Sequence, residues 1–265
     1  MDYSDLIIKE KQLAGKHTDL ILDIGSLLLA SGAHCERINR NLKRIGETWR
    51  YDVDILYDLN GLVITIQSKN DPAIYATRHK RVVKHHVNFT VLNYISLLSW
   101  QVKEESLNPD EVEELFSEIK STSAYPRWFI ILGVALACAA LCLVSKGNWI
   151  DGGIAFMAGG AGIFVRQEIE KRGFFSSVAI IVAAFTTTLI AGLDQYYHLG
   201  STPESALATS VLYLVPGVPL INSVIDLIEG YTNMALARGL LGGFLLLCIA
   251  VGMSLAIFFL GFHNF

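Results

Sequence analysis

The residues best suited to chemistry lie in an apolar stretch around residue 216, which reads Leu214-Val215-Pro216-Gly217-Val218-Pro219-Leu220. Proline lacks a backbone N–H and clashes with the preceding helical turn, and glycine permits backbone angles that other residues avoid. The segment therefore predicts a helix that is interrupted at Pro216-Gly217. Transporters use such interruptions to present helix ends and free carbonyl groups to a solute. A purely structural kink is the alternative interpretation.

Four polar residues follow this interruption at three- and four-residue spacing: Asn222, Asp226, Glu229 and Asn233. That spacing predicts one helical face. Carboxylates so near an apolar segment are costly to bury unless they are paired, hydrated or protonated, and a carboxyl group in a partly dry cavity is suited to carry a proton. Alternatively, the span ends near Leu220 and the face is the solvated side of a cytoplasmic helix. The candidate substrate-pathway residues are Pro216, Gly217, Pro219, Asn222, Asp226 and Glu229.

The composition divides the chain into two parts. Of its 265 residues 52% are hydrophobic and 17% charged, and Lys, Arg, Asp and Glu make up 34 of the first 127 residues but only 12 of the last 138. A surface so poor in charge is not solvated by water. We therefore predict a cytoplasmic α+β domain over residues 1–125 and a helical membrane domain over 126–265. A net charge of −4 provides no basic field for nucleic acid.

Five apolar segments long enough to be spanning helices follow Arg127. They cover about 128–145, 149–165, 176–193, 206–225 and 240–260, and the fourth contains the interruption. In the second, Ala155/Gly159 and Ala158/Gly162 have the spacing of small residues that lets membrane helices pack closely. A substrate path lined by backbone is the alternative for that face.

The distribution of short-loop Lys and Arg predicts the orientation. Arg166, Lys171 and Arg172 follow the second segment and Arg238 follows the fourth, whereas residues 194–204 contain no Lys or Arg. The N-terminus is therefore expected in the cytoplasm and, after five spans, the C-terminus outside. Together with the apparent lack of a cleavable signal peptide, this predicts a multi-pass protein of the inner (plasma) membrane.

The first part shows a change of period along the chain. Helical spacing over 13–31 and 34–49 gives way to alternation over 52–57 and 62–67, with a turn between them and a third strand expected over 74–82. Helices are expected over 88–105 and over 109–121, the latter capped by Asn108. The order ααβββαα predicts a small α+β domain.

The reactive side chains of this part do not form a recognisable catalytic set. His34-Cys35-Glu36 stands at a helix start, but adjacent helical residues point apart, and a nucleophile needs its base within hydrogen-bonding reach. His79, His85 and His86 lie in or near the basic run 78–81, which favours a solvated or lipid-facing patch over a metal site. We predict no enzyme activity, catalytic residue, cofactor or metal, and the four cysteines have no disulfide spacing.

Several of these segments together resemble the threonine/serine exporter family over essentially the whole chain. They are Ser31-Gly32-Ala33 with the charged helix after it, the strand at Gly61-Leu62-Val63-Ile64-Thr65, and the interrupted segment with Asn222, Asp226-Leu227 and Gly230. The family was also noted for a hydrolase-like motif in its N-terminal domain, which corresponds here to His34-Cys35-Glu36-Arg37.

The resemblance implies a cytoplasmic domain followed by five spans. Long members fuse a second set of spans, so this chain resembles the larger subunit of the split version, whose partner is a small separate membrane protein of four or five spans. It implies export of threonine and serine or of succinate-like dicarboxylates. A second copy of this chain, in a homo-oligomer, is the other partner considered. The helix start near Pro219 could receive a carboxylate, Asn222 could donate a hydrogen bond, and Asp226 or Glu229 could bind an ammonium group or relay a proton.

We expect proton-coupled transport because no phosphate-binding loop of the GxxxxGK[ST] type is present. Two alternatives remain. A membrane-embedded enzyme would need clustered nucleophile, base and metal ligands at one depth. A non-transporting scaffold or sensor would act through its cytoplasmic domain and would tolerate substitutions from Pro216 to Glu229.

Overall fold

The computed structural model describes residues 3–82, 87–122, 125–197 and 199–261. The chain forms two compact units. Unit 1 consists of Met1–Ala124 with Val218–Leu240, and unit 2 consists of Tyr125–Gly217 with Leu241–Phe265. Val218–Leu240 thus groups with the N-terminal part, whereas the predicted division at residues 125/126 assigns this segment to the membrane domain. That division stays a prediction.

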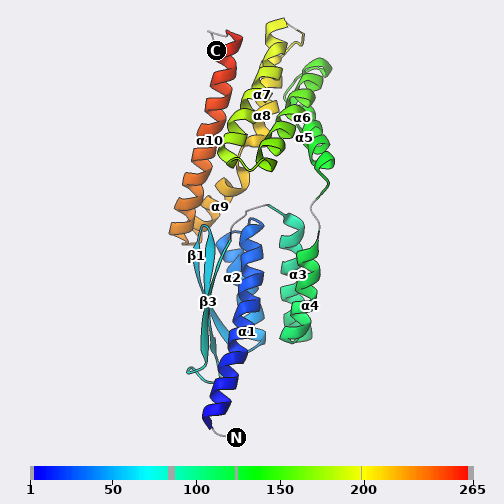
Figure 1. Ribbon diagram of the computed structural model, residues 1–265. Helices are drawn as coiled ribbons and strands as arrows, with labels where there is room; N and C mark the ends of the chain where they lie inside the picture. The colour runs from blue at the N-terminus through cyan, green and yellow to red at the C-terminus, as the bar shows by residue number, and fades with distance from the viewer. Residues whose placement is uncertain (1–2, 83–86, 123–124, 198, 262–265) are drawn as a thin grey trace. The chain divides into compact units, whose positions relative to one another are not determined.

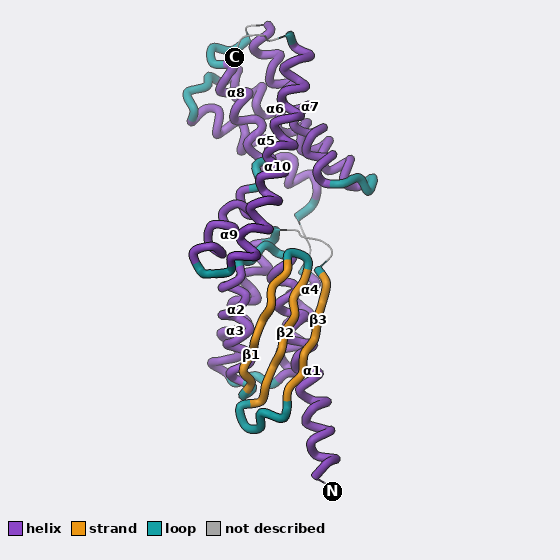
Figure 2. The backbone as a smooth tube through the Cα atoms, turned by 90° about the vertical axis from the view of Figure 1, so that its left-hand side faces the viewer, coloured by secondary structure: helices purple, strands orange, loops and turns teal. Residues whose placement is uncertain are grey.

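Unit 1 contains the element order expected from the sequence. The elements are α1 (Tyr3–Ala30), α2 (Cys35–Thr48), β1 (Tyr51–Asp58), β2 (Gly61–Ser68), β3 (Tyr75–Arg81), α3 (Phe89–Glu105) and α4 (Pro109–Ser121). The three strands form one antiparallel sheet in the order β1-β2-β3, with Val53 opposite Ile66 and Thr65 opposite Thr77. Helices lie against one face of this sheet, and no described helix of unit 1 covers the other face (Figure 2). The predicted α+β architecture of this part is confirmed.

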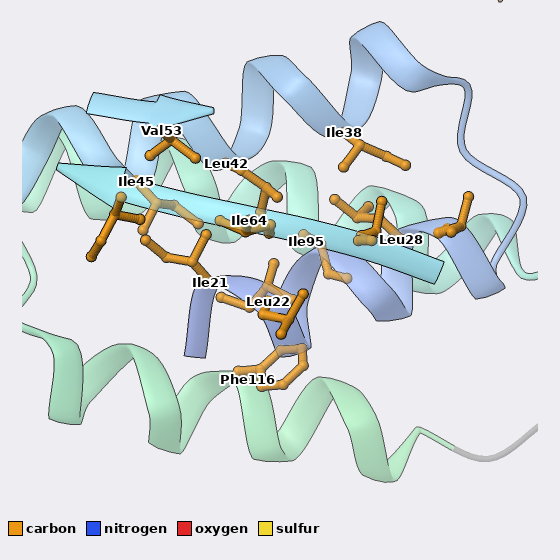
Figure 3. Close-up of a cluster of buried hydrophobic side chains, with 14 of the residues drawn as sticks. Ile21, Leu22, Leu28, Ile38, Leu42, Ile45, Val53, Ile64, Ile95 and Phe116 are labelled. Carbon is orange, nitrogen blue, oxygen red and sulfur yellow. The ribbon is translucent and has the colours of Figure 1, made fainter. Parts of the chain in front are cut away.

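The core of unit 1 lies between the covered face of the sheet and helices α1 to α4. Its largest members are fully or almost fully buried and include Ile21, Leu28, Ile38, Leu42, Ile45, Ile64 and Ile95 (Figure 3). Gly25 of α1 permits this packing, because a Cβ there would lie 2.7 Å from Leu42 Cδ1. Each fully buried Leu or Ile side chain stabilises the fold by roughly 1.5–3 kcal/mol relative to exposure.

The basic run of β3 is partly paired with α1. Arg78 Nε lies 3.2 Å from Asp19 Oδ1, and Lys80 pairs with Asp23. The predicted solvated or lipid-facing patch is therefore partly neutralised by acids of the neighbouring helix. His85 and His86 lie outside the described residues.

Unit 2 is helical. It contains α5 (Arg127–Val144), α6 (Trp149–Lys171), α7 (Ser176–Tyr197), α8 (Pro203–Val211) and the 3-10 turn η1 (Leu212–Leu214), together with the end of α10 (Thr232–Leu260) (Figure 1). Large apolar side chains of α5 point outward, with Trp128 and Phe129 each 70% exposed. Such a surface is suited to lipid.

Three helices are long and apolar enough to cross a membrane, namely α5, α7 and α10. The pair α8-η1 and α9 (Gly217–Ile228) adds a fourth crossing if the two pieces form one broken span. Helix α6 is long enough, but its last turns carry Arg166, Glu168, Glu170 and Lys171. Within the described residues the structure therefore supports three or four spans, and the fifth stays a prediction.

The small residues of α6 pack against neighbouring helices, as predicted. Ala155, Ala158, Gly159 and Gly162 are all buried. A Cβ on Gly162 would lie 1.9 Å from the Thr187 hydroxyl of α7, so only glycine allows this approach. The close-packing interpretation of this face is confirmed.

The interruption expected at Pro216-Gly217 is present. Helical geometry ends with η1, Val215 is extended with φ −60° and ψ 126°, and α9 begins at Gly217. An extended residue before proline follows from the clash of the proline ring with the backbone that precedes it.

Helix α9 is shorter than the predicted polar face. Gly230 has φ +87°, the Gly230 N–H donates to Leu227 O, and the Tyr231 N–H donates to Asp226 O at 2.7 Å. This is a glycine-terminated helix end. The prediction of one continuous face through Asn233 is therefore wrong, because Asn233 belongs to α10.

Candidate functional site

Polar side chains of α9, of the turn after it and of the start of α10 converge on the N-terminus of α2, all within unit 1. We call this set the α2–α9 cluster. Its members are His34, Cys35, Glu36, Tyr57, Asn222, Asp226, Glu229, Tyr231 and Arg238.

Asp226 is the centre of the cluster and is completely buried. Its Oδ1 accepts a hydrogen bond from the Cys35 backbone N–H at 2.8 Å, and its Oδ2 accepts one from Arg238 Nη1 at 2.6 Å. Arg238 is itself 6% exposed, and its Nη2 donates to Ala33 O at 2.8 Å. Asp226 and Arg238 thus form a buried ion pair with hydrogen bonds on both partners, the condition under which such a pair is tolerated.

The Asp226 carboxylate also caps α2 from a distant part of the sequence. His34 is the N-cap residue of α2, but its side chain makes no capping hydrogen bond. The first N–H groups of a helix lack intrahelical partners and carry a partial positive charge. Asp226 therefore neutralises both Arg238 and part of the charge at the α2 N-terminus.

The turn between α1 and α2 is held in the same way. Gly32 has φ +91°, which favours glycine, and its carbonyl accepts a hydrogen bond from Asn222 Nδ2 at 2.8 Å. The next carbonyl, Ala33 O, is the acceptor for Arg238. Two consecutive carbonyl groups that the turn leaves outside the helices are thereby satisfied.

The rim of the cluster is more exposed. His34 Nδ1 lies 3.1 Å from Glu229 Oε2, and the two side chains are 19% and 28% exposed. Glu36 accepts a hydrogen bond from the Tyr231 hydroxyl at 2.9 Å. The Tyr57 hydroxyl donates to Cys35 O, and its ring packs edge-on against Tyr231.

The electrostatics make Cys35 a structural thiol. Its side chain is fully buried, and burial followed by the Asp226 charge raises the pKa of this thiol far above that of free cysteine. Burial also raises the pKa of Tyr231, which the Glu36 carboxylate reinforces, so the phenol remains a donor. The His34-Cys35-Glu36 stretch therefore lacks the activated thiolate that a cysteine nucleophile needs.

One group in the cluster has donors suited to a metal ion. The ligand atoms of His34, Asp226 and Glu229 all lie within 4.8 Å of one another. Imidazole and carboxylate ligands suit several divalent cations. However, Asp226 is already neutralised by Arg238, whose positive charge opposes a second cation. The described geometry fits a hydrogen-bonded ion-pair network better than a metal centre.

The structure brings together only some of the predicted pathway residues. Asn222, Asp226 and Glu229 meet in the cluster, whereas Pro216 and Gly217 lie in unit 2 and Pro219 lies in the first turn of α9.

Sequence reasoning missed the role of Arg238, which it used only as an orientation signal. Arg238 is one of five Lys and Arg residues after residue 127. A cation so rare in an apolar region could have suggested a pairing with one of the two acids that precede it, Asp226 and Glu229.

Comparisons with known proteins identify the family of this chain. Residues 19–260 match the model of the ThrE family, described as "Putative threonine/serine exporter". The chain is 34% identical over 91% of its length to the "Probable succinate transporter subunit YjjP" of Escherichia coli K12, of which it covers 93%. It is 31% identical to the protein of the same name in Klebsiella aerogenes, over 90% of this chain and 92% of that one.

Longer relatives match over only part of their length. The "Threonine/serine exporter" of Corynebacterium glutamicum is 24% identical over 86% of this chain, which covers 47% of that protein. No solved structure matches. The family match and the apolar helices identify a membrane protein. The chain belongs to the threonine/serine exporter family.

Proposed function

We propose that this chain is the larger subunit of a two-component exporter in the inner membrane. The second component is a small separate membrane protein of four or five spans. The near-complete coverage of relatives named as subunits, against 47% coverage of longer exporters, supports this division. The exported solute is a small carboxylate, either a succinate-like dicarboxylate or threonine and serine.

The proposed topology has a cytoplasmic N-terminus, five crossings that include α6, and an external C-terminus. One contact within unit 2 supports the count. Arg127 Nε, at the start of α5, donates to Gln167 Oε1 at 2.8 Å, and Arg127 also pairs with Glu168, both near the end of α6. The start of α5 and the end of α6 therefore lie together, as in two antiparallel crossings joined by a short loop.

The solute assignment rests on the groups that hold the buried Asp226 carboxylate. A guanidinium group and a helix-terminal N–H hold this carboxylate, which lies near the end of α9, the helix that follows the interruption. These donors are the ones that proteins use to bind carboxylate and phosphate ligands. In our proposal the carboxylate of the solute replaces Asp226 on Arg238 and on the Cys35 N–H.

Release of Asp226 then leaves a carboxylate that needs a new partner. For an amino acid this partner is the ammonium group of the solute, and for a dicarboxylate it is a proton or an ordered water. Glu229, which pairs with His34 at the more exposed rim, offers a second acceptor. This exchange gives a physical route to proton coupling, because binding the solute changes the charge balance of a buried site.

Transport by proteoliposomes that contain both subunits tests the proposal. We expect Arg238→Gln to raise the apparent KM for the solute by about 10–100-fold, since a hydrogen bond to a charged group contributes about 1.5–3 kcal/mol. Arg172→Gln is the matched control, because Arg172 is 68% exposed and lies outside the cluster. Wild-type kinetics in a folded Arg238→Gln protein would reject the solute site and favour the scaffold or sensor alternative.

A further inference from the structure

Unit 2 contains two buried aspartates that the α2–α9 cluster does not use. Asp151 lies in the first turn of α6 and Asp194 near the end of α7, and neither has any exposed surface. Buried carboxyl groups in an apolar helical unit are costly and are usually functional. Their surroundings therefore indicate what they bind.

Asp151 has the surroundings of an ionised carboxylate. Its Oδ2 accepts hydrogen bonds from the Asn148 N–H at 2.8 Å and from the Thr202 hydroxyl at 2.7 Å, and the Thr202 N–H lies 3.2 Å from the same oxygen. It also occupies the third position of a capping box at the α6 N-terminus. The helix dipole there favours negative charge.

Asp194 has fewer donors. Its Oδ1 accepts a hydrogen bond from the Gly200 N–H at 2.7 Å, and its buried Oδ2 has no hydrogen-bond partner among the residues that the structure describes. A cavity of about 400 Å³ reaches Asp194. The rest of its lining is apolar and comprises Ile150, Gly153, Ile154, Met157, Ile190, Leu193 and Leu199.

The two carboxyl groups lie close together beside Gly200. Gly200 makes room for them, because a Cβ on this residue would lie 1.6 Å from Asp151 Oδ1 and 3.1 Å from Asp194 Oδ1. The other titratable group that faces the pair from a described element is the Cys142 thiol of α5. Within the described ranges neither carboxyl group forms an ion pair with a cation.

Two buried carboxylates this close together repel each other when both are ionised without a compensating cation, which favours a shared proton. We propose that Asp151 and Asp194 form a proton-binding site of unit 2. The proton adds to Asp194 Oδ2, which converts the carboxylate into a carboxylic acid, while Asp151 remains ionised. When the proton leaves, Asp194 becomes a buried carboxylate beside the ionised Asp151, with fewer hydrogen-bond donors than Asp151 has.

The position of the pair indicates its use. In the proposed topology the start of α6 and the end of α7 face the outside, where a proton enters as a solute is exported. The coupling role rests on the proposed function, whereas binding of the proton does not.

Infrared difference spectroscopy of the purified full-length chain tests proton binding directly. We expect a carbonyl band from a buried protonated carboxyl group that shifts in D₂O, titrates with pH and disappears in Asp194→Asn. Asp151→Asn should shift the midpoint of this titration, whereas Glu204→Gln, an exposed acid in the same region, should leave it unchanged. A band that persists in folded Asp194→Asn would overturn the proposal. A response to sodium ions at constant pH without any such band would assign the pair to a metal cation and would also overturn it.

Proteoliposome export at varied external pH tests the coupling role. Asn resembles protonated Asp, so we expect Asp194→Asn to retain solute binding but to lose the dependence of export on external pH. His198→Gln is the comparison variant for this assay. His198 is a titratable residue four positions after Asp194 in the sequence, and it lies outside the described residues. A pH dependence that disappears in His198→Gln and persists in Asp194→Asn would overturn the coupling role. Solute export that is absent even from the wild type would instead argue against the proposed function and leave the infrared result intact.

Discussion

Replacement of Arg238 by methionine is the sharpest test of the α2–α9 cluster. The guanidinium group donates to Asp226 Oδ2 and to Ala33 O, and both charged partners are more than nine-tenths buried. Methionine keeps much of the apolar bulk of the side chain and removes both hydrogen bonds. The Asp226 carboxylate then keeps the Cys35 N–H as its remaining described donor.

The expected loss is large for a single substitution. Removing one partner of a buried ion pair typically costs about 3–5 kcal/mol, because the other charge stays buried without compensation. For a unit of this size about 1 kcal/mol corresponds to roughly 2–4 °C in Tm, so unit 1 should melt about 6–20 °C lower. The double variant Asp226→Leu with Arg238→Met removes both charges and should recover part of this loss, because no buried charge is then left without a partner. The unpaired Cys35 N–H and Ala33 O remain as a residual cost.

Thermal unfolding of the purified protein in detergent, followed by circular dichroism and by proteolysis of unit 1, measures Arg238→Met, Asp226→Leu and the double variant. Arg172→Met, at an exposed arginine of unit 2, is the control and should unfold within about 0.5 kcal/mol of the wild type. An Arg238→Met protein as stable as the control would refute the reasoning. A double variant whose loss equals the sum of the two single losses would refute it as well, since the pair would then have no coupling energy.

Three further predictions concern other parts of the chain. Changing Pro216-Gly217 to Ala-Ala should restore a continuous helix and abolish transport in proteoliposomes at unchanged insertion, and full activity would remove the need for the interruption. Gly162→Ala should destabilise unit 2 by about 1–3 kcal/mol through overpacking against α7, whereas Gly153→Ala in the same helix, with open space at its Cβ, should be neutral or slightly stabilising in thermal unfolding. Because burial and a nearby carboxylate raise the pKa of Cys35, iodoacetamide at pH 8 should modify this thiol only after denaturation, and rapid labelling of the folded protein by mass spectrometry would contradict its buried, protonated state.

Much of the fold follows from local patterns in the sequence. The alternation at Val53 and Ile55, the turn before Gly61 and the capping signal at Asn108 are short-range features, and each predicts an element that the structure contains. The interruption at Pro216-Gly217 is equally local, because the missing N–H and the proline ring act on the immediately preceding turn.

The candidate site depends on contacts that no local pattern contains. Asp226 and Cys35 are 191 residues apart in the chain, and they meet because α9 packs on the start of α2. The polar spacing placed Asn222 and Asp226 on one helix, and the structure has both in α9 and in the cluster, but the spacing extended the face too far because Gly230 ends the helix. Asp151 and Asp194 went unnoticed because each stands alone among apolar residues, and only the folding of α6 against α7 brings both beside Gly200.

The most direct measurement is uptake and release of labelled succinate and labelled threonine by proteoliposomes that contain this chain with and without the small second subunit. The proposed function predicts flux of at least one of the two solutes, a requirement for both subunits, and a strong loss of that flux in Arg238→Gln. Absence of flux for both solutes, with both subunits folded and inserted, would contradict it.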